Sequence, residues 1–194
     1  MKQTCPYCLA SASPRRKELL ERFGFRFEVL PTHVDESALP GERPEELVAR
    51  LARLKAQAVC GLRPQSLAIA GDTLVVLGGD VLGKPRGRDD AVRMLRALSG
   101  QEHRVLSGYH LQQGPGGEAV NRTVETRVRF RELPEEWIAW YADLPETMDK
   151  AGAYAIQGMG GLLVSGIEGS YTNVVGFPVE QVVWDLIRQG WAAL

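Results

Sequence analysis

Ser11-Ala12-Ser13-Pro14-Arg15-Arg16-Lys17-Glu18-Leu19-Leu20 has the pattern of a strand end, a tight turn and the start of a helix. Ser13 is a suitable N-cap, and Pro14 suits the first helical position because the N–H that proline lacks would have no partner there. Gly24 suits the left-handed conformation that often follows a helix. The segment therefore predicts a strand–turn–helix unit, and the remaining chain extends it to an α/β fold.

The predicted first turn of this helix carries three cations, Arg15, Arg16 and Lys17. Cations are unfavourable at a helix N-terminus, where the backbone already presents partial positive charge. The hydroxyls of Ser11 and Ser13, free backbone N–H groups and two guanidiniums would together bind a phosphate well. The alternative is a basic turn that is simply solvated.

The composition is that expected for a soluble globular protein, and the length suits one domain of good size or a domain of two lobes. The chain has 194 residues, of which 44% are hydrophobic and 24% charged. The net charge of −1 argues against a general nucleic-acid binder. No apolar run is long enough for a bilayer, no signal-peptide pattern is seen at the N-terminus, and three cysteines do not favour a secreted disulfide framework. We therefore expect a cytoplasmic protein without nucleic-acid or membrane partners.

Cys5-Pro6-Tyr7-Cys8 has the spacing of a redox pair or of half a zinc site. Zinc would need further paired ligands, and the remaining cysteine and histidines, Cys60, His33, His103 and His110, lack such spacing. The helix is predicted to start well after Cys8, so its N-terminus would not lower the pKa of the first thiol. The alternative is that both cysteines belong to the first strand and the segment leading into it.

Periodicity predicts the other elements. Helices are expected at residues 44–59 and 89–98, from Pro134, and at 179–189, with a hairpin turn at 78–80. Strands or extended segments are expected at residues 26–30, 67–77, 103–112, 120–131, 162–167 and 171–175. The whole pattern favours one compact α/β domain with two lobes.

Asp72 lies inside the most apolar run of the chain, residues 67–77. Burying a carboxylate is costly unless it is paired, metal-bound or at an opening, which makes Asp72 the main catalytic candidate. The alternative is a structural aspartate that caps a turn. Lys84 follows the hairpin, and Lys55 lies at the edge of an apolar helix stripe, where it either reaches into a cleft or is solvated.

The segment around Asp35 and Glu36 is predicted to be an acidic loop that could hold a divalent cation. Adjacent residues of an extended chain point to opposite sides, so we expect only one of the two to face a site. A solvated loop is the alternative, and His33 has no assigned role. Residues 149–158 are rich in small residues and include Lys150 and Gln157, which favours either a ligand site or a tight turn.

These residues together suggest hydrolysis of a phosphoanhydride. Lysines and arginines neutralise phosphate oxygens, and carboxylates hold a divalent ion or activate water. The sequence lacks the Gly-x-x-x-x-Gly-Lys-[Ser/Thr] pattern of P-loop enzymes.

Eight motifs follow one another along the chain: Leu9-Ala10-Ser11-Ala12-Ser13-Pro14-Arg15-Arg16, Val34-Asp35-Glu36, Lys55 in its helix, Ala70-Gly71-Asp72-Thr73, Gly83-Lys84-Pro85, Asp149-Lys150-Ala151-Gly152-Ala153-Tyr154, Ile156-Gln157-Gly158 and Gly169-Ser170-Tyr171-x-Asn173-Val174-Val175-Gly176. With these motifs in this order, the chain closely resembles the Maf family of nucleoside triphosphate pyrophosphatases over nearly its full length. The resemblance implies an inosine-triphosphatase-like fold, with a long mixed sheet, flanking helices and two lobes around a central cleft. It also implies cleavage between the α and β phosphates with Mg²⁺ or Mn²⁺, and a possible homodimer.

Two branches of this family differ at three positions. One branch resembles dTTP/UTP pyrophosphatases and carries Arg, Thr and Gln, as this chain does at Arg15, Thr73 and Gln157. The other acts on 7-methyl-GTP and carries Trp, Gln and Glu there. A glutamine amide matches the N3–H and O4 of uracil or thymine, whereas a glutamate accepts from guanine and a tryptophan stacks on a cationic base.

The resemblance also implies a role for each matched residue. Asp72 would be the general base or a metal ligand, and Glu36 a metal or water partner. Thr73 and Gln157 would select the nucleobase. The triphosphate would contact Ser11, Ser13, Arg15, Arg16, Lys55, Lys84 and Lys150. The alternative functions are a 7-methyl-GTP pyrophosphatase and a nucleotide-binding regulator of septum formation and cell division with little turnover.

Overall fold

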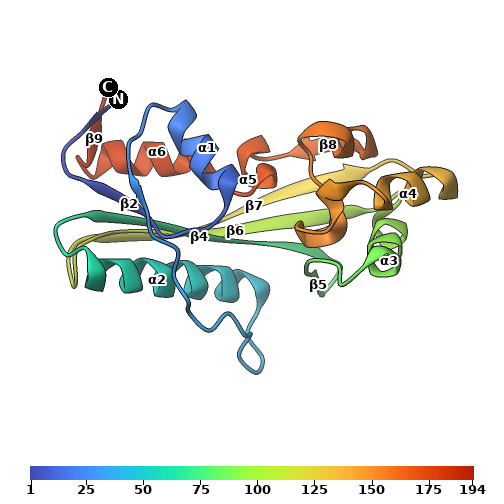
Figure 1. Cartoon of the computed structure of the whole chain (residues 1–194), viewed down its shortest axis with the longest axis horizontal. Coiled ribbons are helices and arrows are strands. Elements are labelled where there is room, and N and C mark those ends of the chain that lie inside the picture. The colour runs from blue at the N-terminus through green and yellow to red at the C-terminus, as the bar shows by residue number, and fades with distance from the viewer. The chain divides into compact units, whose positions relative to one another are not determined.

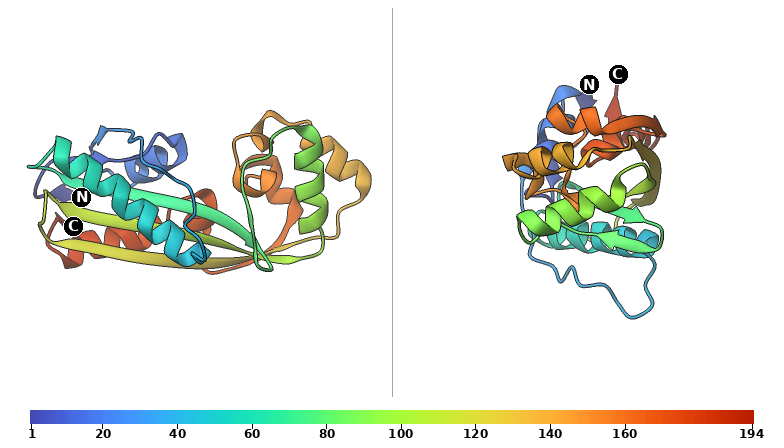
Figure 2. Two further views of the ribbon diagram at one scale, coloured as in Figure 1. Left: turned by 90° about the horizontal axis from the view of Figure 1, so that it is seen from below. Right: turned by 90° about the vertical axis from the view of Figure 1, so that its right-hand side faces the viewer.

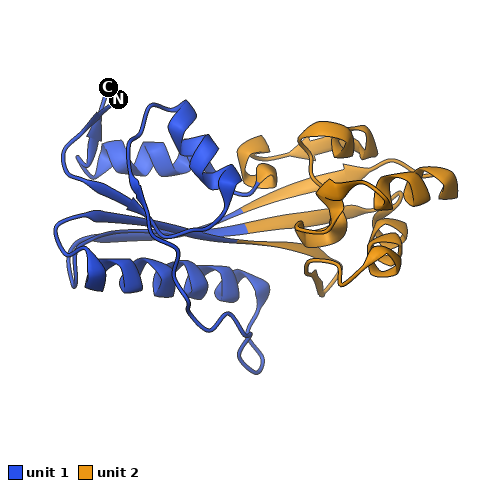
Figure 3. Cartoon of the chain, viewed as in Figure 1, with its two compact units in different colours: residues 1–72, 107–124, 176–194 blue, residues 73–106, 125–175 orange.

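The computed structural model describes every residue from Met1 to Leu194 and divides into two compact units (Figure 3). Unit 1 consists of Met1–Asp72, Ser107–Val124 and Gly176–Leu194. Unit 2 consists of Thr73–Leu106 and Glu125–Val175. None of the helices combines the length and hydropathy that a bilayer-spanning segment needs.

A seven-stranded sheet contributes strands to both units, in the order β3-β2-β4-β6-β7-β8 with β5 paired to β4. The sheet is mixed, because β2 pairs in parallel with β3 and β4 while β4 and β5 form an antiparallel hairpin. A separate ladder joins the chain ends through β1 (Lys2–Gln3) and β9 (Ala192–Ala193) (Figure 1). The main-sheet strands are β2 (Tyr7–Leu9), β3 (Glu28–Val29), β4 (Leu67–Leu77), β5 (Asp80–Leu82), β6 (Glu102–Gln113), β7 (Ala119–Phe130) and β8 (Val164–Glu168).

Helices cover both faces of the sheet within unit 1. In Figure 1, α2 (Pro44–Leu62) lies on one face, and α1 (Pro14–Arg22) and α6 (Val179–Arg188) lie on the other. The α2 side is packed by small buried side chains, which bring the helix close to β2 and β4. This cluster consists of Cys8, Ala10, Ala56, Val59, Cys60, Ala68 and Ala70.

The predicted strand–turn–helix unit is confirmed. Helix α1 begins at Pro14, and Gly24 has the left-handed φ of +80° just after the helix. Ser13 is at the N-cap position, but its side chain makes no capping hydrogen bond. The Oγ of Ser11 instead accepts the N–H of Ser13 at 3.1 Å, so the serine pair orders the turn before the helix.

Besides strands of the sheet, unit 2 contains short helices, and α3 packs beside α4 (Figure 2). Its predicted hairpin and helices are present within a few residues of the expected bounds. The elements are α3 (Arg88–Leu98), α4 (Glu135–Ala142), α5 (Tyr171–Val175) and the 3₁₀ segments Pro145–Thr147, Ala151–Ala153 and Gly158–Leu163.

One prediction about unit 2 is wrong, because residues 171–175 form helix α5 rather than an extended segment. The Oγ of Ser170 accepts the N–H of Asn173 at 3.0 Å, which is the contact of an N-capping serine. The carbonyl of Ser170 also accepts the N–H of Val174 at 3.3 Å. A cap therefore starts a helix that is too short to show helical periodicity in the sequence.

The three cysteines are free, and Cys8 and Cys60 are buried. Burial raises the pKa of all three thiols above the ordinary value. A raised pKa disfavours the nucleophilic thiolate that redox chemistry needs. Cys8 lies within β2 and Cys5 just before it, so the geometry favours the structural interpretation of this pair.

His103 gives the stability of the fold a dependence on pH. Its Nε2 lies 2.8 Å from the hydroxyl of Tyr154, and burial lowers its pKa to about 4. The unfolded chain therefore binds the proton first, and stability is lost as pH falls from about 6.5 to about 4, by about 3 kcal/mol from this group. Urea unfolding of wild type and His103→Gln across this range should show a shallower loss in the variant. Parallel curves would contradict this assignment.

Candidate active site

A buried ammonium–carboxylate cluster lies in unit 1. The Nζ of Lys55 is 2.8 Å from Oδ1 of Asp72 and 2.8 Å from Oε1 of Glu36. Only 8% of Lys55 and 9% of Asp72 are exposed, whereas the Glu36 side chain is 57% exposed. One cation therefore bridges a carboxylate on strand β4 and a carboxylate on the loop before α2.

The local sequence explains how this cluster forms. Lys55 follows Leu51 and Ala52 by one helical turn on α2, and these neighbours face the core. A charge on that buried face needs a partner, which Asp72 supplies from the adjacent strand. The interpretation of Lys55 as a solvated helix lysine is thus wrong. Of the three ways to offset the cost of burying Asp72, the structure shows pairing with a charged side chain.

The two acids of the loop point in different directions. Glu36 contacts Lys55, whereas Oδ1 of Asp35 accepts the N–H of Ser37 at 2.9 Å. That backbone hydrogen bond lowers the pKa of Asp35. As expected for adjacent residues, the two carboxylates point apart, and Glu36 is the one that contacts the Lys55–Asp72 pair.

Arg16 holds three segments of unit 1 together. Its Nε donates to the carbonyl of Gly176 at 3.0 Å, and its Nη1 donates to the carbonyl of Gly71 at 2.7 Å and to Oγ of Ser11 at 3.3 Å. Burial lowers the pKa of the guanidinium, and the nearby charge of Asp72 opposes that shift. Because Gly71 directly precedes Asp72, Arg16 fixes the backbone that carries the candidate base.

Gly71 is needed because of packing against a core ring. A Cβ at this position would lie 2.7 Å from Cε2 of Phe177 and 3.2 Å from the carbonyl of Gly108. The structure shows that its closest neighbour is the Phe177 side chain.

The remaining residues of the predicted site in unit 1 lie around the start of α1. The first turn contains Arg15 and Arg16 and no acidic residue. Lys17 contributes a weak exposed ion pair with Glu21, one turn further along the helix, at 3.8 Å. The predicted excess of positive charge at this helix start is therefore present.

Unit 2 contains the other predicted residues, Thr73, Lys84, Lys150 and Gln157. The N–H of Gly152 donates to the carbonyl of Gly83 at 3.1 Å, which brings the segments of Lys84 and Lys150 together. Lys84 is exposed, and Lys150 forms an ion pair with the adjacent Asp149. Thr73 directly follows Asp72 on β4, so the boundary between the units falls between these two residues.

No group of three or more His, Cys, Asp or Glu side chains suited to hold a metal ion is present in residues 1–194. Glu36 and Asp72 nevertheless present two carboxylates toward one point, occupied by the Lys55 ammonium. Mg²⁺ commonly uses one or two carboxylates, with substrate phosphates and water as further ligands. The donor set therefore fits a metal that binds together with a triphosphate.

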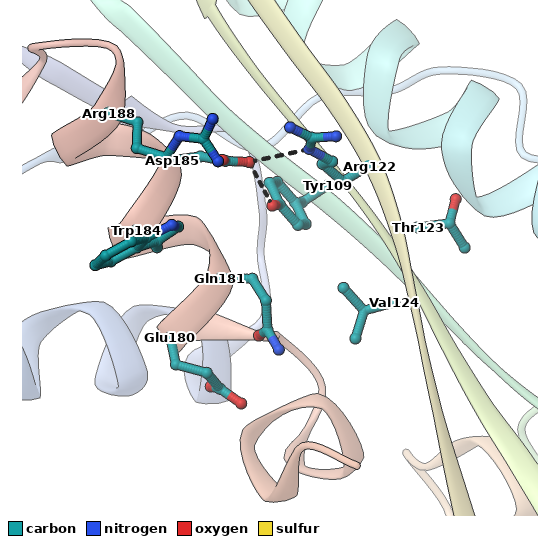
Figure 4. Close-up of a pocket in the computed structure, with 9 residues that line it drawn as sticks. All are labelled: Tyr109, Arg122, Thr123, Val124, Glu180, Gln181, Trp184, Asp185 and Arg188. Atoms are coloured by element: carbon teal, nitrogen blue, oxygen red, sulfur yellow. Dashed lines mark hydrogen bonds and ion pairs between the residues drawn. The ribbon is translucent and has the colours of Figure 1, made fainter.

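A separate open pocket of about 610 Å³ lies between α6 and strands β6 and β7 of unit 1 (Figure 4). Oδ2 of the buried Asp185 accepts from the Tyr109 hydroxyl at 2.8 Å and from Nε of Arg122 at 3.3 Å. Trp184 lies on its rim and is exposed. None of the residues predicted to form the site lines this pocket.

Known structures with a similar fold include two Ham1 proteins. The Ham1 protein of Coxiella burnetii is 16% identical, with a TM-score of 0.54 over 95% of this chain and all of that chain. The Ham1 protein of Staphylococcus aureus is 13% identical, with a TM-score of 0.53 over 95% of this chain and 99% of that chain. These matches confirm the predicted fold class, an α/β fold with a mixed sheet and flanking helices.

Sequence comparison gives much closer relatives. The dTTP/UTP pyrophosphatase of Anaeromyxobacter sp. (strain Fw109-5) is 52% identical over 94% of this chain and 88% of that protein. The dTTP/UTP pyrophosphatase of Syntrophus aciditrophicus is 47% identical over 94% of this chain and 89% of that protein. The family described as Maf-like protein matches residues 6–189. The chain therefore belongs to the Maf-like protein family.

Proposed function

We propose that this protein is a nucleoside triphosphate pyrophosphatase that hydrolyses dTTP and UTP to the monophosphate and pyrophosphate, a housecleaning hydrolase. The observation that carries the proposal is the buried Asp72 carboxylate held by Lys55. The dTTP/UTP pyrophosphatases that are about half identical to this chain support the substrate class.

Asp72 is the proposed general base. Its carboxylate would take a proton from the attacking water, whose oxygen bonds to phosphorus while the bond to the oxygen bridging the α and β phosphates breaks. Nζ of Lys55 donates to Oδ1 of Asp72 at 2.8 Å and so holds the carboxylate in place. Arg15, Arg16, Lys84 and Lys150, with the hydroxyls of Ser11 and Ser13, would neutralise and position the triphosphate.

A divalent cation, Mg²⁺ or Mn²⁺, is part of this proposal. Glu36 and Asp72 would supply its protein ligands, and the cation when bound would neutralise charge on the phosphates. Lys55 keeps the two carboxylates close together before substrate arrives. We expect pyrophosphate release to stop in excess EDTA and to return when Mg²⁺ or Mn²⁺ is restored.

Gln157 and Thr73 would select the nucleobase of the substrate, and Arg15 would contribute to this selection. Replacing Gln157 by alanine removes an amide that would pair with N3–H and O4 of the pyrimidine. We expect kcat/KM for UTP and dTTP to fall about tenfold, the cost of roughly one hydrogen bond. Steady-state kinetics of Gln157→Ala beside the neighbouring Met159→Ala would measure this. Equal kinetics in both variants would remove Gln157 from base selection.

The deciding experiment measures pyrophosphate release from a panel of triphosphates that includes dTTP, UTP, CTP, GTP and 7-methyl-GTP. Fastest turnover of dTTP and UTP supports the proposal. Preference for 7-methyl-GTP would favour the other branch of the family. Tight binding without turnover would instead indicate a nucleotide-binding regulator of septum formation and cell division.

Location and assembly are also proposed. Three free cysteines and a nucleotide substrate are consistent with the reducing cytoplasm. A homodimer is the proposed assembly, and light scattering coupled to gel filtration would distinguish it from a monomer.

A further inference from the structure

The loop that carries Gln157 rests on a tyrosine–glutamate pair within unit 2. The hydroxyl of Tyr141 accepts the N–H of Ala155 at 3.1 Å and donates to Oε1 of Glu146 at 2.8 Å. The same Oε1 accepts the N–H of Gly160 at 3.2 Å. Two backbone amides, one on each side of Gln157, are thus held by one pair of side chains.

Two glycines allow the loop to lie on this pair. A Cβ at Gly160 would be only 2.5 Å from the hydroxyl oxygen of Tyr141 and 2.0 Å from the carbonyl of Ala155. Gly158 has φ +78°, and a Cβ there would lie 3.2 Å from Oε2 of Glu146. The backbone on both sides of Gln157 therefore follows the contour of the Tyr141–Glu146 pair.

The pair is itself rigidly placed. Tyr141 is fully buried on α4, and burial raises its pKa, so the hydroxyl keeps the proton that it donates to Glu146. Glu146 belongs to the 3₁₀ segment that follows α4 and is partly buried. Gln157, by contrast, is the N-cap of the next 3₁₀ segment, and its side chain makes no capping hydrogen bond. Its orientation therefore depends on how the surrounding backbone is held.

We propose that Tyr141 and Glu146 are positioning residues that set base selectivity by fixing the Gln157 loop, an inference that rests on the proposed function. A glutamine amide offers both a donor and an acceptor. Uracil presents N3–H and O4, whereas cytosine presents N3 as an acceptor and an amino group as a donor. An amide that is free to move would serve either base, so discrimination requires a fixed loop.

Tyr141→Phe tests this directly, because it removes the hydroxyl and keeps the ring. We expect the preference for UTP over CTP, taken as the ratio of kcat/KM values, to fall about tenfold. Amide hydrogen exchange at Ala155 and Gly160 should become faster. Tyr171→Phe is the matched control, since Tyr171 is exposed in the same unit, and it should leave both the ratio and the exchange rates unchanged.

Glu146 supplies a graded second test. Glu146→Gln keeps an oxygen that accepts from Tyr141 and Gly160, so it should retain most of the preference. Glu146→Ala should lose as much as Tyr141→Phe. A preference unchanged in both Tyr141→Phe and Glu146→Ala, despite faster exchange, would overturn the proposal and leave the pair a purely structural role.

Binding measurements separate this inference from the proposed function. Dissociation constants for UTP and CTP are measured by calorimetry in the presence of Ca²⁺ for wild type and Tyr141→Phe. If wild type releases no pyrophosphate but its binding preference falls about tenfold in the variant, the proposed function fails and the positioning role stands. If wild type hydrolyses UTP, and Tyr141→Phe changes neither the kcat/KM ratio nor the binding preference for UTP over CTP, the positioning role fails and the proposed function stands.

Discussion

Asp72→Asn is expected to lower kcat for pyrophosphate release from dTTP about a thousandfold, the typical contribution of a general base. Asparagine has the shape of aspartate but cannot take a proton from water. It also leaves the buried Lys55 ammonium with only the exposed Glu36 as its charged partner. The measurement is steady-state release of pyrophosphate from dTTP, with binding of dTTP measured separately.

The control for this variant is Asp80→Asn, which makes the same chemical change at an exposed position of the β4–β5 hairpin. It should retain the activity and the thermal stability of the wild type. Undiminished turnover in Asp72→Asn would remove Asp72 from the role of base. If Asp72→Asn loses dTTP binding as well as turnover, the main role of Asp72 is in substrate binding.

Arg16→Lys is expected to lower kcat about a hundredfold, the effect of a misplacement of about 1 Å at a reacting group. Lysine keeps the positive charge, but a single ammonium cannot reproduce the planar set of donors that reaches Gly71, Gly176 and Ser11. The backbone before Asp72 would then lose its fixed position. Because charge is retained, KM for dTTP should change much less than kcat.

Three measurements test the Arg16 prediction. Lys17→Ala, one residue further along the same helix, removes an exposed cation and should leave kcat unchanged. Added guanidinium should partly restore turnover in Arg16→Ala, as expected when the missing group is a planar donor. A large rise in KM with unchanged kcat would show that Arg16 acts only in binding the triphosphate and would contradict its role in fixing the backbone before Asp72.

Sequence pattern predicted most of the secondary structure because the elements are long enough to show it. The apolar run 67–77 is strand β4, and the alternation in residues 120–131 corresponds to the buried face of β7. The prediction for residues 171–175 was wrong because helix α5 is too short to show a helical pattern, since five residues complete little more than one turn. A capping serine started that helix, and its signal is local rather than periodic.

The sequence also indicated that Asp72 is an unusual residue, because burying a carboxylate within an apolar run has a cost that the fold must offset. It left the environment of Lys55 open, because helical spacing shows which face a residue lies on but not which charge it meets. The ion pair with Asp72 joins a helix and a strand that are paired only in the folded chain.

By itself, the sequence determined the α/β elements, the positive charge at the start of α1 and the family to which the chain belongs. Only the tertiary structure decided that Arg16 fixes the backbone at Gly71 and that Tyr141 and Glu146 hold the Gln157 loop. The physical reason is that these side chains bind backbone groups. Every residue except proline has the same N–H and C=O, so such partners leave no signature in the sequence.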